Sequence, residues 1–326
     1  MSRKYINQIP ETTGKVELMK WLSKCIGLAL GGGGARGLAH IGVIRVLEQE
    51  EIPIDIIVGT SSGALIGGAY ASGTTPDEME RKIDEYLNSE EYQSSAIRTI
   101  EKAHSGERAS LRQQVQGFLQ NKFLLLQAMF KPGILSAEEF QSMINFFIPD
   151  MLIQNTPIPF RTVTTDLISG GQIIFSEGSL RDAVMASSAV PGAIEPRRKG
   201  AMHLSDGGII SLVPVNAARK EGADIVIAVN ITRGIFSEEK LETAQEICDR
   251  AADITSYHLI GYELTAADVV IRPDVGNLHW SDFSHAGNLI AEGEKAARNN
   301  ISDIRKAIPL LRRLLARSES PEHTIN

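Results

Sequence analysis

The sequence predicts an α/β protein with a mostly parallel sheet that is covered by helices on both faces. Short apolar runs rich in β-branched residues alternate along the chain with segments of helical periodicity. Several of these runs end in glycine-rich turns that lead directly into a helical segment. Strands that are separated by helices pair in parallel, because the chain must cross over the sheet before it adds the next strand.

The first part of this pattern consists of two strand–turn–helix units. A strand is expected at 26–30, followed by a helix over 38–50 whose apolar residues recur every three to four positions. A second strand is expected at 54–58, and the helix after it, over 62–72, is rich in alanine and glycine. Such small residues predict a helix that packs closely on the sheet.

The stretch from about 75 to 150 interrupts the alternation and is predicted to be a helical insertion. Pro76 stands at an expected helix start and is followed by acidic residues, which the helix dipole favours there. The most apolar part of the insertion is 118–130. It fits either a helix buried against the sheet or a lid or interfacial helix that faces lipid.

In the later part of the chain, strand-like and helical segments alternate again. A glycine-containing turn at 168–171 separates two strand-like runs and predicts a hairpin. The last helical pattern has an apolar face with basic residues beside it over 301–317, which suits docking on the core or on anionic lipid. Further strands are expected at 160–165, 172–175 and 224–230, and further helices at 214–221, 238–264 and 285–316.

Composition limits the class of protein. The chain has 326 residues, of which 43% are hydrophobic and 22% charged, enough for a globular core. The net charge of −7 argues against nucleic acid as a partner. Two cysteines cannot form a disulfide framework or a zinc site.

The chain shows no signal-peptide pattern and no 18-residue apolar run, which predicts a cytoplasmic protein with at most peripheral membrane contact. The sequence does not specify an oligomeric state.

We predict the following organisation. Residues 1–24 form an N-terminal arm, and 25–235 form the main α/β domain with its insertion at about 75–150. Residues 236–317 form a C-terminal helical region that packs on this domain, and 318–326 form a polar tail.

The glycine-rich turn after the first expected strand, at 31–37, is a candidate anion-binding loop. Glycines let the backbone come close to a ligand, and a helix N-terminus favours negative charge. Such N–H groups can stabilise the oxyanion of a tetrahedral intermediate. Arg36 either braces the loop or meets a substrate phosphate. The candidate oxyanion donors are Gly32, Gly33 and Gly34, and Arg36 and Gly37 support the motif.

The same turn also satisfies G-x-G-x-x-G, the pattern of a dinucleotide site. That site needs an acid at the end of the next strand to hold the ribose. The next strand instead ends at Val58, and its acid, Asp55, lies near its start. A nucleotide-binding protein is therefore a remote alternative.

The second glycine-rich turn carries a candidate nucleophile. Residues 59–63 read Gly-Thr-Ser-Ser-Gly and match G-x-S-x-G, in which a serine occupies a sharp strand-to-helix turn. Ser61 is the central serine, and Gly59 and Gly63 relieve crowding against the following helix. Ser62 is out of register and is expected to begin that helix.

A serine nucleophile needs a base, and a third glycine turn provides a candidate. Asp206 is followed by Gly207 and Gly208 after a short strand-like segment. An aspartate has a reference pKa of about 3.9, and partial desolvation beside the serine would raise it. The alternative is a triad in which His279 or His285 is the base, since both follow Asp206 in the chain.

Taken together, the three motifs resemble the patatin-like phospholipase family. Their order and spacing agree with that family, and further similarity lies at 165–167 and 186–192. The third turn reads D-G-G where D-G-A is commoner. The resemblance implies a three-layer α/β/α fold and hydrolysis of acyl esters of phospholipids, lysophospholipids or related lipids, without a metal or other cofactor.

The resemblance also implies roles for individual residues. Ser61 is the nucleophile and Asp206 its base in a dyad without histidine, and Asp166 is expected to have a structural role. Two other functions remain open. One is an acyltransferase that uses the same dyad, and the other is a non-catalytic regulatory or scaffold protein, which would have no need of all three motifs.

Overall fold

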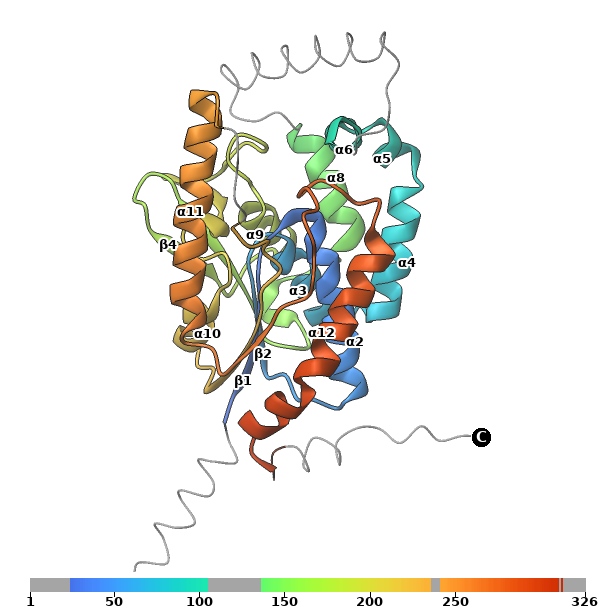
Figure 1. The fold of residues 1–326 in the computed structure, drawn as a ribbon, viewed down its shortest axis with the longest axis vertical. Helices are drawn as coiled ribbons and strands as arrows, with labels where there is room; N and C mark the ends of the chain where they lie inside the picture. Colours follow the sequence, from blue (N-terminus) through green and yellow to red (C-terminus); the bar gives the residue numbers. More distant parts are fainter. Residues whose placement is uncertain (1–23, 105–135, 236–240, 311, 313–326) are drawn as a thin grey trace, which may run out of the picture.

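The computed structural model describes residues 24–104, 136–235, 241–310 and 312, and these form a mixed sheet of eight strands between two layers of helices (Figure 1). Five strands are parallel and lie in the order β3-β2-β1-β7-β8. Beyond β3 the sheet continues with antiparallel strands. The strands are β1 (Ile26–Leu30), β2 (Ile56–Gly59), β3 (Phe160–Asp166), β4 (Gln172–Phe175), β5 (Arg197–Lys199), β6 (Met202–Asp206), β7 (Ile225–Val229) and β8 (Val269–Ile271).

Alternating side chains of the central strands create a hydrophobic core on each face of the sheet. In β1, Ile26, Leu28 and Leu30 pack into one cluster, and Ala29 packs into the other. This period of two is what a pleated strand imposes. Because both faces are apolar, both must be covered, and a parallel sheet of this kind is buried between helices.

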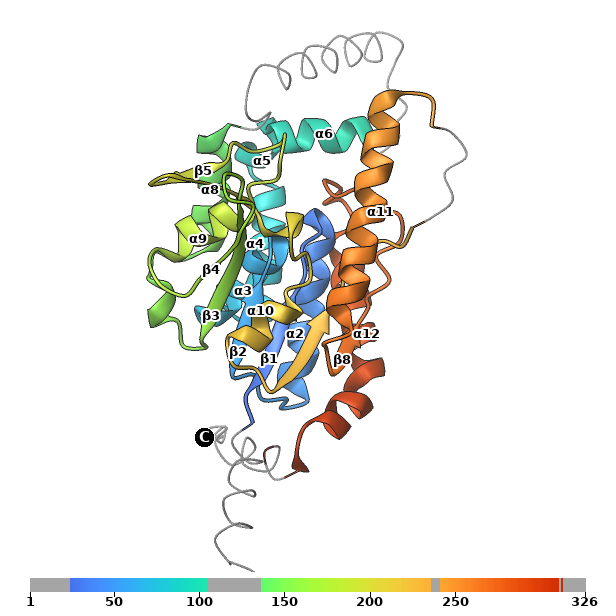
Figure 2. The ribbon, with the colours of Figure 1, turned by 90° about the vertical axis from the view of Figure 1, so that its left-hand side faces the viewer.

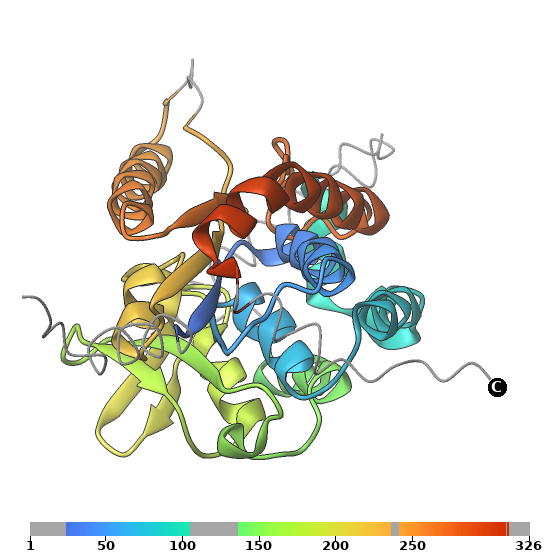
Figure 3. The same cartoon turned by 90° about the horizontal axis from the view of Figure 1, so that it is seen from below.

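The two helical layers differ in size (Figures 1 and 3). The larger layer packs on the face of Leu28, and α10 and α11 pack on the face of Ala29. Helix α6 lies across one end of the molecule (Figure 2). No helix in the described ranges is long and apolar enough to traverse a bilayer. The helices are α2 (Ala39–Gln49), α3 (Ser62–Ala71), α4 (Pro76–Leu87), α5 (Glu90–Ser94), α6 (Ala96–His104), α8 (Ala137–Phe147), α9 (Leu180–Ser187), α10 (Val215–Lys220), α11 (Ala244–Leu264) and α12 (Ala286–Ala307).

The layered α/β/α fold and the hairpin at 168–171 are confirmed. Helix α12 ends at Ala307, within the helix expected over 285–316, and residues 310 and 312 are helical again after this break. Pro309 explains this end, since it lacks an N–H donor and disfavours helical geometry in the residue before it. The lid-or-core segment 118–130, the arm 1–23 and the tail 318–326 lie outside the described residues.

Three elements were not expected from the sequence, namely β5, β8 and α9. The two strands have three residues each, too few to show a period of two. Helix α11 begins at Ala244 rather than at 238, because Thr243 and Glu246 form a capping box at its N-terminus.

Two glycines allow α2 and α12 to pack backbone against backbone. A β-carbon at Gly42 would come within 1.9 Å of the Ile290 carbonyl oxygen, and one at Gly293 within 2.0 Å of the Ala39 oxygen. The two helices would have to separate to admit either carbon. Since α2 follows the glycine-rich turn directly, this packing also supports the turn.

We expect Gly293→Ala to lower the free energy of unfolding by about 2 kcal/mol or more, because overpacking forces the backbone to shift. Chemical denaturation monitored by circular dichroism measures this change. Gly287→Ala in the same helix is the matched control, since a β-carbon there meets nothing within 4 Å. The control should be neutral or slightly stabilising, and equal losses in both variants would contradict the packing explanation.

Candidate active site

One edge of β3 brings two of the glycine turns together. The first half of this edge pairs with β2, where Thr162 lies opposite Gly59. The second half pairs with β6, where Thr164 lies opposite Asp206. Strand β4 pairs with both halves of β3 and so occupies the other edge. The C-terminal ends of β2 and β6 therefore face each other, and the turns that follow them meet.

Ser61 lies in a strained turn between β2 and α3. Its backbone dihedrals are φ 54° and ψ −122°, a left-handed conformation that non-glycine residues rarely adopt. A β-carbon at Gly63 would come within 2.1 Å of the Leu30 oxygen, and one at Gly59 within 2.5 Å of the Gly63 oxygen. Helix α3 begins at Ser62, as expected. Gly63 thus allows the turn to approach β1, and Gly59 allows the first residues of α3 to lie close to the end of β2.

Asp206 lies next to Ser61 and is almost completely buried, with 5% of its surface exposed. Its carboxylate accepts a hydrogen bond from the Gly208 N–H at 2.7 Å. Burial raises the pKa of Asp206 to about 6, and the Ser61 hydroxyl and the Gly208 N–H oppose the rise because they favour the charged carboxylate. Gly207 lets the turn approach β3, since a β-carbon there would meet the Val163 oxygen at 2.2 Å. The result is a carboxylate poised to exchange a proton near neutral pH.

Ser187 braces the backbone of the nucleophile turn. Its hydroxyl oxygen accepts a hydrogen bond from the Ser61 N–H at 3.0 Å and donates to the Val163 oxygen at 2.7 Å. The sequence analysis noted only that the segment 186–192 is similar to the family. It did not single out Ser187 as the residue that holds Ser61, although its place in that segment was the available signal.

In the glycine loop, residues 31–37, two backbone N–H groups donate no hydrogen bond to a described protein acceptor. The Gly32 N–H donates to the Leu212 oxygen at 2.9 Å, so it is not available to an oxyanion, contrary to expectation. The Ala35 N–H likewise donates to the Trp280 oxygen at 2.7 Å. Among the described residues, no protein acceptor contacts the N–H groups of Gly33 and Gly34. The N–H groups of Gly33 and Gly34 therefore remain as the candidate oxyanion donors.

Two polar side chains hold this loop in place. Arg36 donates from Nε to the Gly33 oxygen at 3.0 Å, which matches the bracing role considered for it. His40, fully buried in α2, lies with Nε2 2.7 Å from the Gly31 oxygen. Burial lowers the pKa of His40 to about 4, so its imidazole is neutral and Nε2 is the donor. The sequence analysis did not single out His40, because its surroundings read as an ordinary buried helix face.

Asp166 organises the hairpin between β3 and β4. Its carboxylate accepts hydrogen bonds from the N–H groups of Ile168, Ser169 and His203 and from the Ser169 hydroxyl at 2.6 Å. These hydrogen bonds lower the pKa of Asp166 to about 2, and the one from the Ser169 hydroxyl has the largest effect. The expected structural role is consistent with this geometry.

The two histidines of the triad alternative lie in the segment before α12. His279 is hydrogen-bonded through Nδ1 to the Ser281 hydroxyl at 2.7 Å. His285 contacts Asp282 at 3.2 Å. Neither histidine is among the groups that shift the pKa of Asp206.

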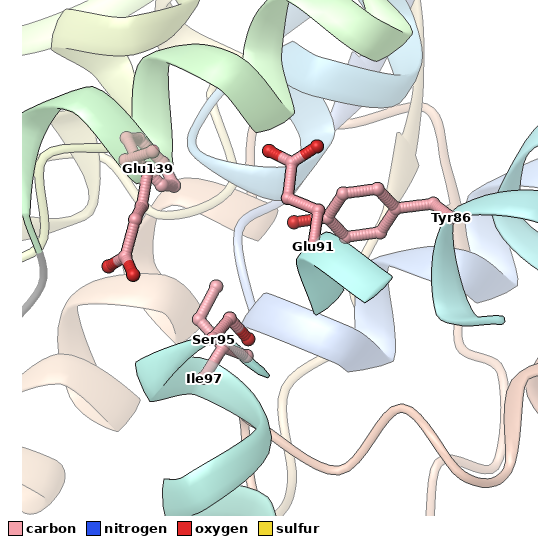
Figure 4. Close-up of a pocket in the computed structure, with 6 residues that line it drawn as sticks. Tyr86, Glu91, Ser95, Ile97 and Glu139 are labelled. Atoms are coloured by element: carbon pink, nitrogen blue, oxygen red, sulfur yellow. The ribbon is translucent and has the colours of Figure 1, made fainter. Parts of the chain in front are cut away.

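Two cavities differ in their relation to Ser61. The smaller, of about 20 Å³, is lined by residues of α4, α5, α8 and the start of α6 (Figure 4). None of its lining residues belongs to the three glycine turns. The larger, of about 120 Å³, is lined in part by Arg36 and Leu212 and adjoins the glycine loop. Within the described ranges, no cluster of three or more histidine, cysteine or carboxylate side chains could hold a metal ion.

The chain is similar in sequence to known proteins of one family. The family model described as patatin-like phospholipase matches residues 28–219, more than half of the chain. An uncharacterized NTE family protein of Mycobacterium tuberculosis (strain ATCC 25618 / H37Rv) is 34% identical over 206 residues, which cover 63% of this chain and 49% of that protein. Patatin-like phospholipase domain-containing protein 7 of Mus musculus is 30% identical over 209 residues, 63% of this chain and 13% of that protein. The chain thus spans about half the length of the mycobacterial relative and much less of the murine one. Among solved structures, VipD from Legionella pneumophila aligns over 87% of this chain and 67% of its own, with a TM-score of 0.48 and 14% identity.

Proposed function

The chain belongs to the patatin-like phospholipase family, and from this premise we propose that it is a serine acyl hydrolase. Its substrates are the carboxylic esters of phospholipids, lysophospholipids or related lipids. The observation that supports this most is that the Ser61 hydroxyl lies beside the buried carboxylate of Asp206, close enough to influence its pKa. A serine in a strained elbow beside a carboxylate of raised pKa is the arrangement that nucleophilic catalysis requires.

In the proposed mechanism, Ser61 Oγ attacks the ester carbonyl while the Asp206 carboxylate accepts its proton. The oxyanion of the tetrahedral intermediate accepts hydrogen bonds from the N–H groups of Gly33 and Gly34. Their contribution is about 3 kcal/mol each for well-aimed donors. Asp206 then returns the proton to the leaving alcohol, and an acyl-enzyme remains on Ser61. A water molecule that loses its proton to Asp206 attacks the acyl carbonyl. Asp206 then gives this proton to Ser61 Oγ as the Oγ–acyl bond breaks, which releases the fatty acid and restores the free serine.

The elbow geometry supports this assignment. The left-handed conformation of Ser61 is costly, and the Ser187 hydroxyl and the flanking glycines hold it in place. Strain that the surroundings maintain is typical of functional sites. Peripheral contact with a membrane surface is part of the proposal, because the substrates reside there.

Incubation with a fluorophosphonate probe and with fluorogenic acyl esters tests the proposed function. We expect one equivalent of probe to be bound per chain and to block ester turnover, because fluorophosphonates react with activated serines. Mass spectrometry of the labelled peptide should place the adduct on Ser61. A protein that neither reacts with the probe nor cleaves any ester of the panel would refute the hydrolase proposal.

A further inference from the structure

Glu263, near the C-terminus of α11, is a buried carboxyl group that the proposed mechanism does not use. Only 4% of its surface is exposed. Of the α11 side chains that the structure describes, three are buried, and all lie in the last two turns of the helix: Ile260, Glu263 and Leu264. Ile260 and Leu264 pack into the core on the Ala29 face of the sheet. A carboxyl group at such a point of attachment is costly unless a polar partner is present.

The partner of Glu263 is Ser211, in the segment after β6. The Ser211 hydroxyl donates to Glu263 Oε1 at 2.7 Å. The other carboxyl oxygen, Oε2, is buried and has no hydrogen-bond partner among the described residues. Burial raises the pKa of Glu263 to about 7, and the Ser211 hydroxyl opposes this rise most strongly. Because a buried oxygen without a partner lowers stability, the fold alone does not account for a carboxyl group at this position.

Ser211 is also the residue at which two of the glycine turns meet. Its backbone oxygen accepts a hydrogen bond from the Thr60 hydroxyl at 2.9 Å, and Thr60 directly precedes Ser61. Its N–H donates to the Gly207 oxygen at 2.8 Å, within the turn that follows Asp206. Ser211 and Thr60 are both buried. Ser211 therefore links the turn of the nucleophile to the turn of the base.

The next residue, Leu212, extends this contact to the glycine loop. Its oxygen accepts the Gly32 N–H at 2.9 Å. A β-carbon at Gly32 would lie 2.8 Å from Leu212 Cδ1 and 3.0 Å from the Ser61 β-carbon, so the loop, the elbow and this segment are in close contact. All three glycine turns thus contact residues 211–212, and Glu263 binds this segment to α11.

We propose that Glu263 is a positioning residue of the active site, which acts through Ser211 to hold the three glycine turns at the separation that the reaction needs. The inference rests on the proposed hydrolase function and adds a residue to the same site. Glu263 lies beyond residues 28–219, which the family model matches, so the three motifs do not imply this role. A displacement of about 1 Å in a catalytic group can cost roughly 100-fold in rate. A hydrogen bond that fixes all three turns therefore has a large effect on kcat.

Substitutions at both ends of the hydrogen bond between Ser211 and Glu263 test this role with one soluble fluorogenic acyl ester. We expect Glu263→Ala and Ser211→Ala each to lower kcat roughly 10- to 100-fold and to leave KM within about threefold, because they displace the reacting groups rather than the substrate. The double variant should be at most about twofold less active than the less active single variant, since both changes break the same bond. Glu263→Gln should stay within about threefold of the wild type, because its amide oxygen can still accept the Ser211 hydroxyl.

Leu264→Ala is the matched control for lost packing, since Leu264 is buried next to Glu263 on α11 and its side chain forms no hydrogen bonds. This variant should have a lower melting temperature, and the kcat of the folded protein should stay within about threefold of the wild-type value. Unchanged kcat in Glu263→Ala and Ser211→Ala, or an equal loss in Leu264→Ala, would assign Glu263 to the attachment of α11 and overturn the proposal. Losses that multiply in the double variant, or a loss in Glu263→Gln as large as in Glu263→Ala, would overturn the link through Ser211.

Amide hydrogen exchange, which needs no turnover, separates this proposal from the proposed function. In Glu263→Ala, we expect exchange at least about tenfold faster at the N–H groups of Gly32 and Ser211, because their acceptors lie in other turns that are no longer held together. Leu264→Ala should leave exchange at both groups within about threefold of the wild type. Faster exchange in Glu263→Ala, with no ester hydrolysis by the wild type, would refute the hydrolase and retain the role of Glu263 in holding the turns. Hydrolysis by the wild type, with exchange and kcat unchanged in Glu263→Ala, would do the reverse.

Discussion

Replacing Ser61 with alanine is expected to lower kcat for acyl esters by roughly 10⁴-fold or more and to abolish labelling by a fluorophosphonate. Removal of a catalytic serine leaves only the contribution of binding and of the oxyanion donors. The fold should remain, because alanine retains the backbone N–H that donates to Ser187. Steady-state kinetics and intact-protein mass spectrometry measure both effects.

The neighbouring Ser62→Ala variant is the matched control. The Ser62 hydroxyl is buried and has no hydrogen-bond partner in the described part of the structure. Removing an unsatisfied hydroxyl costs little or stabilises the protein. The kcat of the Ser62→Ala variant should stay within about threefold of the wild-type value. A labelled and active Ser61→Ala protein would show that the nucleophile lies elsewhere.

Asp206→Asn is expected to lower kcat by about 10³-fold or more, since asparagine cannot accept the Ser61 proton. In the wild type, only the ionised carboxylate acts as a base. Because the pKa of Asp206 is raised to about 6, kcat/KM should rise with pH up to that value and then level off. The variant should lose this titration, which a pH series from 4.5 to roughly 8.5 would detect.

The same substitution should stabilise the fold above pH 6. The folded-state pKa of about 6 exceeds the ordinary value of 3.8, so the folded protein binds this proton more tightly than the unfolded chain. Stability from this group is therefore lost as the pH rises from about 4 to about 6. Asparagine stays neutral, so Asp206→Asn should gain up to about 3 kcal/mol at pH 8 and nothing below pH 4. Thermal unfolding at both pH values measures the difference.

The triad alternative predicts a different outcome. If His279→Ala or His285→Ala removes activity as completely as Asp206→Asn, a histidine is the base and the dyad is wrong. We expect both histidine variants to retain activity within about tenfold, because the pKa of Asp206 responds to Ser61 and Gly208 and to neither histidine.

The sequence predicted the parts of the site that are built locally. Each glycine turn lies between a strand and a helix that follow one another in the chain, so a change of hydrophobic period marks its position. Ser61 could be singled out because the strained turn needs glycines at fixed offsets around it. Asp206 was identified from the glycine turn that follows it, so its large sequence separation from Ser61 did not hinder the prediction.

The parts that the sequence did not predict depend on contacts between distant segments. Whether Gly32 has a free amide depends on Leu212, which belongs to the turn after β6. The support that Ser187 and His40 give to the two turns depends on how α9 and α2 pack. No local pattern encodes these pairings, since a buried serine or histidine reads like any other residue of a helix face.

The shared edge of β3 has a consequence for folding. The elbow and the glycine loop each arise from neighbouring residues, but Ser61 meets Asp206 only after β6 has paired beside β2 along that edge. Pairings between segments far apart in the chain form late, because closing long loops costs entropy before any contact is gained. A partly folded chain thus holds a serine without its base. Chemical competence therefore requires that both β2 and β6 have paired along the same edge of β3.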